Sequence, residues 1–473
     1  MQANTAVWPA LIRAVQSGLL LAGITLLGIP QGSIAASLFP APPLGLRVTQ
    51  FSTGVDYPTS MTVFGDGSLL VGETTPSASG GFANFYFGSG KLVRMTDTSY
   101  TGVADGAGTI VASGLAGAVT SVRQAGSLIV VATTGNGGPS GLGDEDITFL
   151  RPGATPVSPY TNLGSVHFHF PSFDAAVNIA LDTRLTPGSP GSYDIFFSLG
   201  AGNTTGTPVG NVSITGLITA AKPAGSLYKM TVDTTGNTPS ITSLQQMANG
   251  IRNSGGVLIN QTTGDVYFGD NGYEDSHGVP VSADELNLLT AAQIASNTVT
   301  SFGYPGSYTD YATGVFHGGT GVPALAAFRA TASGAESFGL NELAFAPSWF
   351  PPGLNQGIFG GFDGNFNLAG PGNNTNPVVY VDPTTGMYSY FIAGGQSGIG
   401  HLIGLASTGT TLFLADLAST DGWNAGVGAI YELSSVPEPA SLVFAAAGLL
   451  AMAAARLRER LKARGPAMHE RRE

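Results

Sequence analysis

The chain has no cysteine and little charge: among its 473 residues, only 10 % are Asp, Glu, Lys or Arg. Without cysteine the protein can form neither disulfides nor thiolate metal sites, and a cysteine nucleophile is excluded. The charged fraction is well below the usual quarter of a soluble domain. Basic residues are fewer than acidic residues, with 18 Lys and Arg against 30 Asp and Glu. A chain this acidic repels phosphate backbones, so we expect no binding to nucleic acid.

Glycine and proline are abundant instead, with 69 and 29 residues, and 43 % of the chain is hydrophobic. Clusters of Lys, Glu and Leu at helical spacing are rare. This balance favours many short strands joined by turns. The length suffices for one large domain or for two to three ordinary ones.

Residues 1–35 have the features of a signal peptide. Arg13 is the only charge before an apolar run at 17–29, and small residues at 33–36 offer a cleavage site. The alternative is a buried N-terminal helix, but Pro30 and Gly32 directly after the run argue against its continuing. We therefore expect a signal helix that signal peptidase removes during export.

A second apolar run, at 440–455, lies near the C-terminus and is followed at once by basic residues. As a helix this run would span roughly 24 Å, slightly less than a bilayer core but enough with its flanking residues. Positive charge stays in the cytoplasm, so both ends predict that the body of the protein lies outside. We expect a C-terminal transmembrane helix here.

The residues just before the second run are Val436-Pro437-Glu438-Pro439-Ala440-Ser441. With the apolar run and the arginines, segment 436–465 resembles the PEP-CTERM sorting signal of Gram-negative bacteria. The resemblance implies that exosortase, a transpeptidase-like membrane enzyme, recognises Pro437, Glu438 and Pro439 and releases the protein to the cell surface or the medium. The prolines would hold the motif extended and outside the helix. A plain C-terminal anchor with a proline-rich stalk is the alternative.

Between residues 46 and 433 one pattern recurs six times: an apolar strand, a turn, and a second strand that often ends in an acidic residue. The instances lie at 60–73, 120–133, 177–200, 256–272, 341–364 and 403–416. A third strand follows each pair, at 90–95, 145–150, 225–230, 284–289, 377–382 and 428–433. Short antiparallel strands in four-stranded units, repeated six times, predict an all-β fold, a six-bladed β-propeller. An array of β-sandwiches or a β-solenoid is the alternative.

The pattern also predicts how the ring closes. The last unit lacks an outer strand, whereas the first unit has a spare strand at 47–54. Pairing the two would join the chain ends and remove an exposed edge. We expect the inner-strand residues of the blades to be buried, for example Val63, Ile179, Leu258, Leu343 and Leu405.

The fourth unit, at 249–306, carries five short motifs in a fixed order. They are Arg252-Asn253, Thr263-Gly264-Asp265, Asp270-Asn271-Gly272, Asp284-Glu285-Leu286-Asn287 and Phe302-Gly303-Tyr304-Pro305. In this order they resemble the six-bladed quinoprotein family of glucose/sorbosone dehydrogenases. The fainter repeats extend the resemblance over residues 46–433.

In that family an Arg-Asn pair helps to bind pyrroloquinoline quinone (PQQ), calcium polarises the quinone, and a histidine is the general base. The resemblance implies that Arg252 and Asn253 bind the cofactor, with Asp270, Asp284 and Glu285 as candidate calcium ligands. The alternative is structural: Asn253 turns the chain into the blade, Arg252 pairs with an acidic neighbour, and the acids are solvated.

The family's histidine has no counterpart here, because Phe173 and Asp174 stand at the matching position. His167 and His169 lie upstream on one face of a predicted strand, either as a metal pair with Asp174 or as exposed polar residues. Two functions stay open. One is an exported binding or matrix component, with carbohydrate as a candidate ligand. The other is a PQQ- and calcium-dependent sugar or alcohol dehydrogenase.

Overall fold

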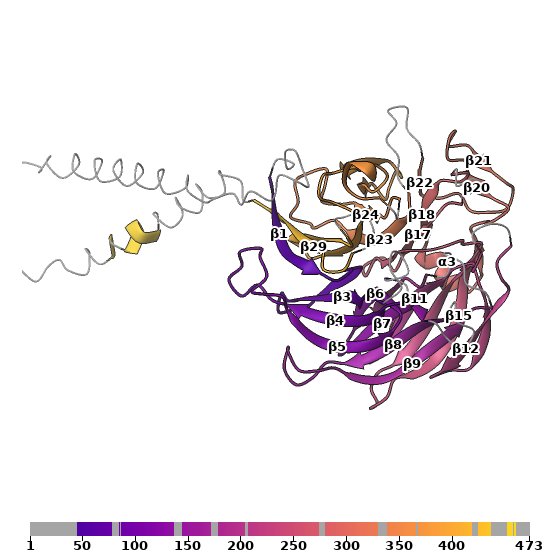
Figure 1. Ribbon diagram of the computed structural model, residues 1–473, viewed down its shortest axis with the longest axis horizontal. Coiled ribbons are helices and arrows are strands. Elements are labelled where there is room, and N and C mark those ends of the chain that lie inside the picture. The colour runs from indigo at the N-terminus through magenta and orange to yellow at the C-terminus, as the bar shows by residue number, and fades with distance from the viewer. Residues whose placement is uncertain are drawn as a thin grey trace, which may run out of the picture.

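The protein is an all-β propeller with six blades, as the repeats predict. The computed structural model describes residues 45–436 and 452–456 with 458–459, leaving out 78–84, 86, 137–143, 172–177, 204–206, 274–279, 330–337, 366–367 and 419–423. Six sheets follow one another around a ring in chain order, as the gradient from indigo to yellow shows (Figure 1). Within a blade, consecutive strands are antiparallel apart from one parallel pair, 248–249 with Thr300–Ser301, and the innermost strands surround a central channel.

Four of the blades have four strands each. From the channel outwards, blade 1 is β2 (Ser60–Val63), β3 (Leu69–Thr75), β4 (Ser89–Met95) and β5 (Thr109–Ala116). Blade 4 is β16 (Val257–Ile259), β17 (Val266–Asp270), β18 (Asp284–Leu289) and β22 (Ala326–Phe328). Blade 5 is β23 (Leu340–Phe345), β24 (Ile358–Phe362), β25 (Val378–Val381) and β26 (Tyr388–Ile392). Blade 6 is β27 (Leu402–Ser407), β28 (Thr411–Asp416), β29 (Gly428–Ser435) and β1 (Leu46–Val55).

Blades 2 and 3 are larger, so the expectation of four strands throughout is wrong for them. Blade 2 is β6 (Ala118–Ala125), β7 (Leu128–Asn136), β8 (Asp144–Arg151), β9 (Thr161–His169), β12 (Asn211–Gly216) and β13 (Ala220–Pro223). Blade 3 is β10 (Leu181–Leu185), β11 (Ser192–Leu199), β14 (Ser226–Asp233), β15 (Ser240–Asn249) and β19 (Thr300–Ser301). The hairpin β12–β13 leaves blade 3 and pairs with β9, so that its Val212 and Ile214 cover an apolar edge of blade 2.

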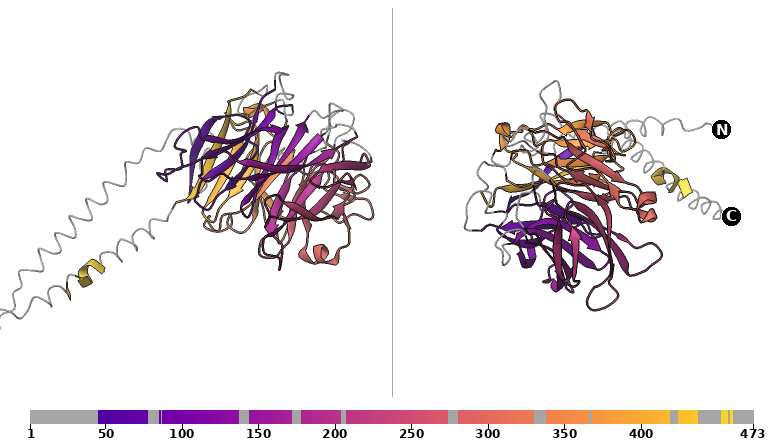
Figure 2. Two further views of the ribbon diagram at one scale, coloured as in Figure 1. Left: turned by 90° about the horizontal axis from the view of Figure 1, so that it is seen from below. Right: turned by 90° about the vertical axis from the view of Figure 1, so that its right-hand side faces the viewer.

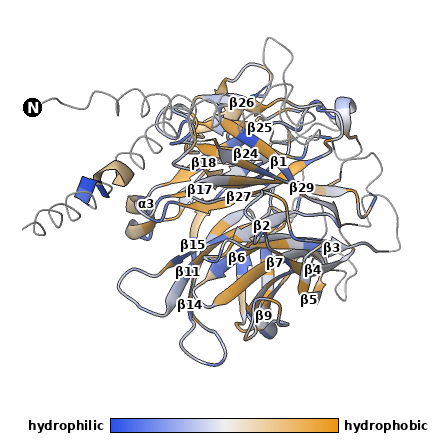
Figure 3. Ribbon diagram, turned by 90° about the vertical axis from the view of Figure 1, so that its left-hand side faces the viewer, coloured by the Kyte–Doolittle hydropathy of each residue, from blue (hydrophilic) through white to orange (hydrophobic). Residues whose placement is uncertain are grey.

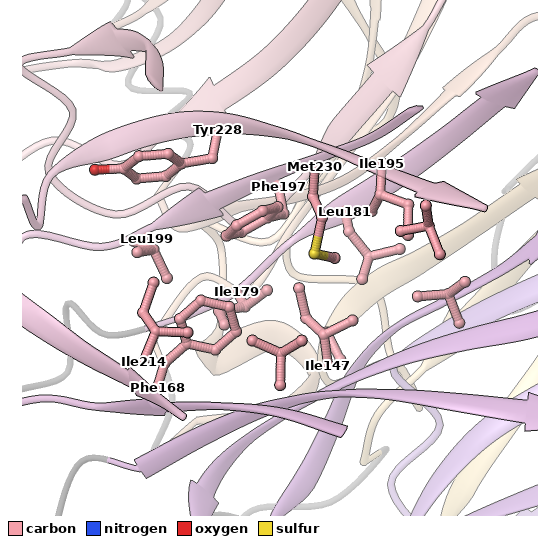
Figure 4. Packing of buried hydrophobic residues seen from close by; sticks show 14 of the residues in the cluster. Ile147, Phe168, Ile179, Leu181, Ile195, Phe197, Leu199, Ile214, Tyr228 and Met230 are labelled. Atoms are coloured by element: carbon pink, nitrogen blue, oxygen red, sulfur yellow. The ribbon is translucent and has the colours of Figure 1, made fainter. Parts of the chain in front are cut away.

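The hydrophobic core lies between the blades. Where blades 2 and 3 meet, the ring of Phe168 on β9 packs against Phe197 on β11, with 5.5 Å between centroids. Phe197 in turn stacks on Tyr228 of β14 at 5.6 Å, and Figure 4 shows these side chains together. Alternate residues of a strand face opposite neighbours, so each blade is held from both sides. Figure 3 accordingly shows hydrophobic stretches alternating with hydrophilic ones along the strands of the blades.

The first strand of the propeller closes the ring onto the last, as predicted. β1 pairs with β29 in antiparallel register, from Leu46 opposite Ser435 to Val55 opposite Gly428. The two strands lie side by side although they come from opposite ends of the chain (Figures 1 and 2). Phe51 of β1 is buried and packs edge-on against Phe413 of β28, with 5.4 Å between ring centroids. The pairing therefore seals both the backbone edge and the apolar layer beneath it.

The predicted burial of the inner strands holds in part. Ile179, Leu343 and Leu405 are buried, as expected. Val63 and Leu258 are only half-buried. In β16 it is the flanking Val257 and Ile259 that are fully buried against blade 3, because neighbouring residues of a strand face opposite sides.

The two segments that are predicted to direct export fall largely outside the described residues. These are the signal helix at 1–35 and the sorting segment at 436–465, of which Val436, 452–456 and 458–459 are described. Within the part of the chain that the structure describes, no helix is both long and apolar enough to cross a membrane.

Replacing Phe51 by alanine tests the closure. We expect Phe51→Ala to lower the free energy of unfolding by about 3–5 kcal/mol, because it removes a buried aromatic side chain from the seam. Thr53→Ala, on an exposed position of the same strand, should change it by less than about 0.5 kcal/mol. Chemical denaturation measures both. Equal effects of the two substitutions would contradict a stabilising role for the seam.

Candidate functional site

One face of the propeller carries the residues that the sequence analysis singled out. The innermost strands begin on this face, and we call it the mouth face. Arg252 and Asn253 lie here in the turn between β15 and β16, while Asp270 ends β17 and Asp284 begins β18. The structure therefore brings the five predicted cofactor and calcium residues together at one end of blade 4.

Asp270 holds the turn that contains Arg252 and Asn253. Its buried carboxylate accepts hydrogen bonds from the backbone N–H of Arg252, at 2.9 and 3.1 Å, and of Asn253, at 2.8 Å. The guanidinium of Arg252 donates to the backbone carbonyl of Gly272 at 2.6 Å. These contacts clamp the turn to the connection that follows β17.

The same arrangement recurs in blade 6. Asp416 ends β28 and accepts hydrogen bonds from the backbone N–H of Gly400, at 3.1 and 3.2 Å, and of His401, at 2.8 Å. In blade 1, Glu73 accepts from the backbone N–H of Asp56 at 3.2 Å. An acid at or near the end of a second strand thus braces the turn that leads into the blade. The recurring acidic residue in the sequence pattern was the signal for this role.

Asp284 and Glu285 are also engaged by hydrogen-bond donors. Asp284 accepts from the N–H of Gly272 at 2.7 Å and from the N–H of Leu340 in blade 5 at 2.8 Å. Glu285 accepts from the N–H and the hydroxyl of Thr309, at 3.2 and 2.8 Å. Burial raises the pKa of Asp270 to about 7 and that of Asp284 to about 6, since desolvation of the charge outweighs these hydrogen bonds.

The blade 4 acids do not form an open cation site in this arrangement. A calcium ion would have to displace the N–H groups now bonded to Asp270, Asp284 and Glu285. Among the residues that the structure describes, no group of three or more His, Asp or Glu side chains is placed to hold a metal ion. The role of these residues as calcium ligands stays a prediction.

The space beside Arg252 is too small for PQQ among the described residues. The cavity there has a volume of about 20 Å³, and Tyr304 and Tyr308 contribute to its walls. A second cavity, at the channel mouth, has about 30 Å³. Sites for organic ligands usually offer several hundred Å³. The quinone does not fit either cavity, so no catalytic step is derived through it.

His167 and His169 lie far from the channel, on the outer strand β9. Each faces a carboxylate of β8: Nδ1 of His167 is 2.7 Å from Asp146, and Nδ1 of His169 is 3.1 Å from Asp144. The two imidazoles are partly exposed, at 41 % and 37 % of their side-chain surface. Asp174, their predicted metal partner, lies outside the described residues. Neither histidine is positioned as a base beside Arg252.

Deeper in the channel the structure shows a buried charge cluster that the sequence analysis missed. Arg123 of β6 contacts Glu342 of β23 at 3.0 Å and Asp182 of β10 at 3.4 Å. Ser60 of β2 donates to the same oxygen of Glu342 at 2.7 Å. These side chains come from four blades and are remote in sequence, so no local pattern predicts their meeting.

The opposite face, where the β2–β3 and β27–β28 turns lie, carries a groove that we call the seam groove. It has a volume of about 480 Å³ and runs between blades 6 and 1. Its lining includes the ring of Tyr100, which is 86 % exposed, and the buried rings of Phe51 and Phe413. Its polar lining is Asp66, Ser68, Thr96, Asp97, Thr98, Thr408, Thr410, Thr411 and Glu432.

Comparisons with known proteins support the fold. No protein-family model and no curated protein matches the sequence. Among solved structures, the PQQ-bound aldose sugar dehydrogenase of Streptomyces coelicolor is similar with 14 % identity and a TM-score of 0.50, over 83 % of this chain and 99 % of that one. The soluble aldose sugar dehydrogenase of Escherichia coli, in its apo-form, has 14 % identity and a TM-score of 0.51, over 83 % and 100 %. This chain is therefore similar to quinoprotein-dehydrogenase-like six-bladed propellers in fold.

Replacing Asp270 tests its role as a buried brace. The folded protein holds the proton of this carboxyl more tightly than the unfolded chain, whose carboxyl has a pKa near 3.8. Unfolding then releases a proton, so the free energy of unfolding falls as the pH rises from about 4 to 7, between the pKa of the unfolded and of the folded state. We expect Asp270→Asn to reduce this fall by on the order of 2 kcal/mol.

Denaturant titrations at several pH values measure the fall. Asp105→Asn is the control, because Asp105 is an exposed carboxyl whose pKa is lowered by the N–H of Thr98. An Asp270→Asn protein that keeps the wild-type pH dependence would show that the pKa of this carboxyl is not raised in the folded state.

Proposed function

We propose that this protein is exported and acts outside the inner membrane as a carbohydrate-binding propeller. In this proposal signal peptidase removes residues 1–35, and the C-terminal helix anchors the chain until exosortase cleaves at Pro437, Glu438 and Pro439. The protein then reaches the cell surface or the surrounding matrix. The observation that carries the binding role is the contrast between the seam groove, at about 480 Å³, and the mouth-face cavities, at about 20 and 30 Å³.

Tyr100 lies in the seam groove on a turn whose backbone is held by hydrogen bonds. Its backbone is in the left-handed region, with φ at 55°, which is uncommon for a residue with a side chain. Asp97 holds this turn by accepting the N–H of Gly102 at 2.6 Å and the N–H of Thr101 at 3.1 Å. Strained residues of this kind concentrate at functional sites. Because the backbone of this turn is already ordered, stacking of a ligand on the exposed ring costs less conformational entropy than it would on a mobile loop.

The chemistry of the groove suits a sugar. The apolar face of a pyranose can stack on the Tyr100 ring, and its hydroxyl groups can donate to carboxylates and exchange hydrogen bonds with threonine hydroxyls. Glu432 lines the groove half-buried, and burial raises its pKa. The volume of about 480 Å³ lies within the range of small-molecule sites. A neutral carbohydrate also avoids the repulsion that an anionic ligand would meet from Asp66, Asp97 and Glu432.

The position of the groove agrees with the proposed anchoring. β29 ends on the groove's face, where Ser434 pairs with Thr411 just after the β27–β28 turn. The C-terminal segment therefore leaves the propeller on the same face and at the same blade as the groove. While the chain is anchored the groove lies toward the membrane, and cleavage by exosortase would expose it.

The alternative function is a PQQ- and calcium-dependent sugar or alcohol dehydrogenase. Its support is the fold shared with the two aldose sugar dehydrogenases and the Arg252-Asn253 motif at the mouth face. The closed mouth-face cavities and the engaged carboxylates of blade 4 favour the binding function.

Removing the Tyr100 ring tests the carbohydrate site. We expect the wild-type protein to be retarded by soluble glucan or xylan in affinity electrophoresis, and Tyr100→Ala to bind about tenfold more weakly. Met387→Ala, which truncates an exposed side chain in blade 5, should bind like wild type. Wild-type protein that ignores both polysaccharides, or a Tyr100→Ala protein that binds normally, would contradict the proposal.

Adding PQQ and calcium to the purified protein separates the two functions. We expect no quinone absorbance to be retained after gel filtration and no reduction of dye with glucose or other aldoses. Turnover that disappears in Arg252→Ala would establish the dehydrogenase instead.

A further inference from the structure

The cavity at the channel mouth, which we call the channel cavity, is lined by all six blades. Its volume is about 30 Å³, which is room for a water molecule or a single small ion and too little for an organic ligand. The polar side chains that line it are Thr59, Thr120, Asn178, Asn341, Glu342 and Asp363.

The hydrogen-bond donors of this lining are largely used elsewhere. The hydroxyl of Thr59 donates to the carbonyl of Val119 at 2.6 Å, and that of Thr120 donates to the carbonyl of Ile179 at 2.7 Å. The amide nitrogen of Asn341 donates to the carbonyl of Gly339 at 3.2 Å and also to Asp363. What these three side chains still offer is oxygen lone pairs. A lining of acceptors favours an occupant that is positively charged.

Glu342 supplies the most direct sign of a missing partner. Its side chain is 2 % exposed, and one oxygen, Oε1, accepts from Ser60 and Arg123. The other oxygen, Oε2, is buried and has no hydrogen-bond partner among the described residues. A buried carboxylate oxygen without a partner is costly. A ligand in the adjoining cavity would remove this cost.

The balance of buried charges around the channel cavity also favours a positively charged occupant. Among the residues that the structure describes, Arg123 is the cation in contact with Glu342, and it is shared with Asp182. Asp363 adds a third buried carboxyl at the cavity. Burial raises the pKa of all three carboxyls, and when they are ionised the group carries two negative charges more than Arg123 balances. A divalent ion neutralises this excess, whereas water does not.

We propose that the channel cavity binds one calcium ion through side-chain oxygens of Glu342, Asp363 and their amide and hydroxyl neighbours. Calcium takes six to eight oxygen ligands in flexible geometry, and six oxygen-bearing side chains line the cavity. The ion would tie the inner strands of several blades together at the axis of the ring. This site is distinct from Asp270, Asp284 and Glu285, and it is independent of carbohydrate binding.

Calcium content and affinity test the proposal on the whole purified protein. After dialysis against EDTA and then against calcium-free buffer, isothermal titration with calcium chloride should show one bound ion per chain, confirmed by elemental analysis. We expect Glu342→Gln and Asp363→Asn each to weaken binding at least about tenfold, because each removes one ligand charge. Glu73→Gln is the matched control, since Glu73 is a buried carboxylate paired with Lys91 in blade 1.

The outcomes separate the alternatives. One ion per chain that is lost in both cavity variants and kept in Glu73→Gln supports the site. No calcium binding by wild-type protein would mean that the cavity holds water and would overturn the proposal. Binding that survives in both cavity variants but is lost in Asp270→Asn would place the ion at blade 4, which overturns it as well. If Glu342→Gln does not fold, Asp363→Asn decides alone.

Discussion

The antiparallel pairing of β1 with β29 is the constraint on which the rest of the propeller depends. A row of six blades without this pairing would end in an open edge of β29, with unpaired N–H and C=O groups and the buried ring of Phe413 uncovered. The pairing fixes the first and sixth blades next to each other. It therefore creates the seam groove, which exists only because the β4–β5 connection of blade 1 meets the β27–β28 turn of blade 6.

On the mouth face, opposite the seam groove, buried carboxylates hold the turns between the blades in place. Asp270, Asp416 and Glu73 each hold the turn that leads into their own blade, and Asp284 holds the start of blade 5 from blade 4. Since these acids bond to backbone N–H groups, the turns are fixed without large side chains. Glycines then allow close approach: a Cβ at Gly272 would lie 2.1 Å from the carbonyl oxygen of Ser282. The mouth face is consequently tightly closed around the residues that resemble a cofactor site.

The fold was predictable from the sequence because its signals are local. Gly67 and Gly264 occupy the positive-φ positions of the β2–β3 and β16–β17 turns, and alternating apolar residues mark the strands on each side. The hairpin β12–β13 was missed because it is an excursion from blade 3 that is stable only against β9. The Arg123–Glu342 contact joins residues 219 positions apart, so the local pattern of apolar and polar residues could not predict it. Arg252 and Asn253 were singled out from the sequence, but the atoms that their backbone N–H groups bond to depend on the carboxylate of Asp270 on another strand.

The closure also sets an order of events for a chain made from its N-terminus. β1 emerges first and its partner β29 emerges last, so nearly the whole body must be synthesised before the ring can close. Until then β1 has no partner in its own first blade, whose four strands are already complete. Contacts of such long sequence separation form slowly. Closure of the ring therefore requires the complete body of the chain. A chain truncated anywhere before Ser435 keeps an unpaired first strand and an open last blade. Unpaired strands and exposed edges of this kind are the features that proteases and chaperones bind.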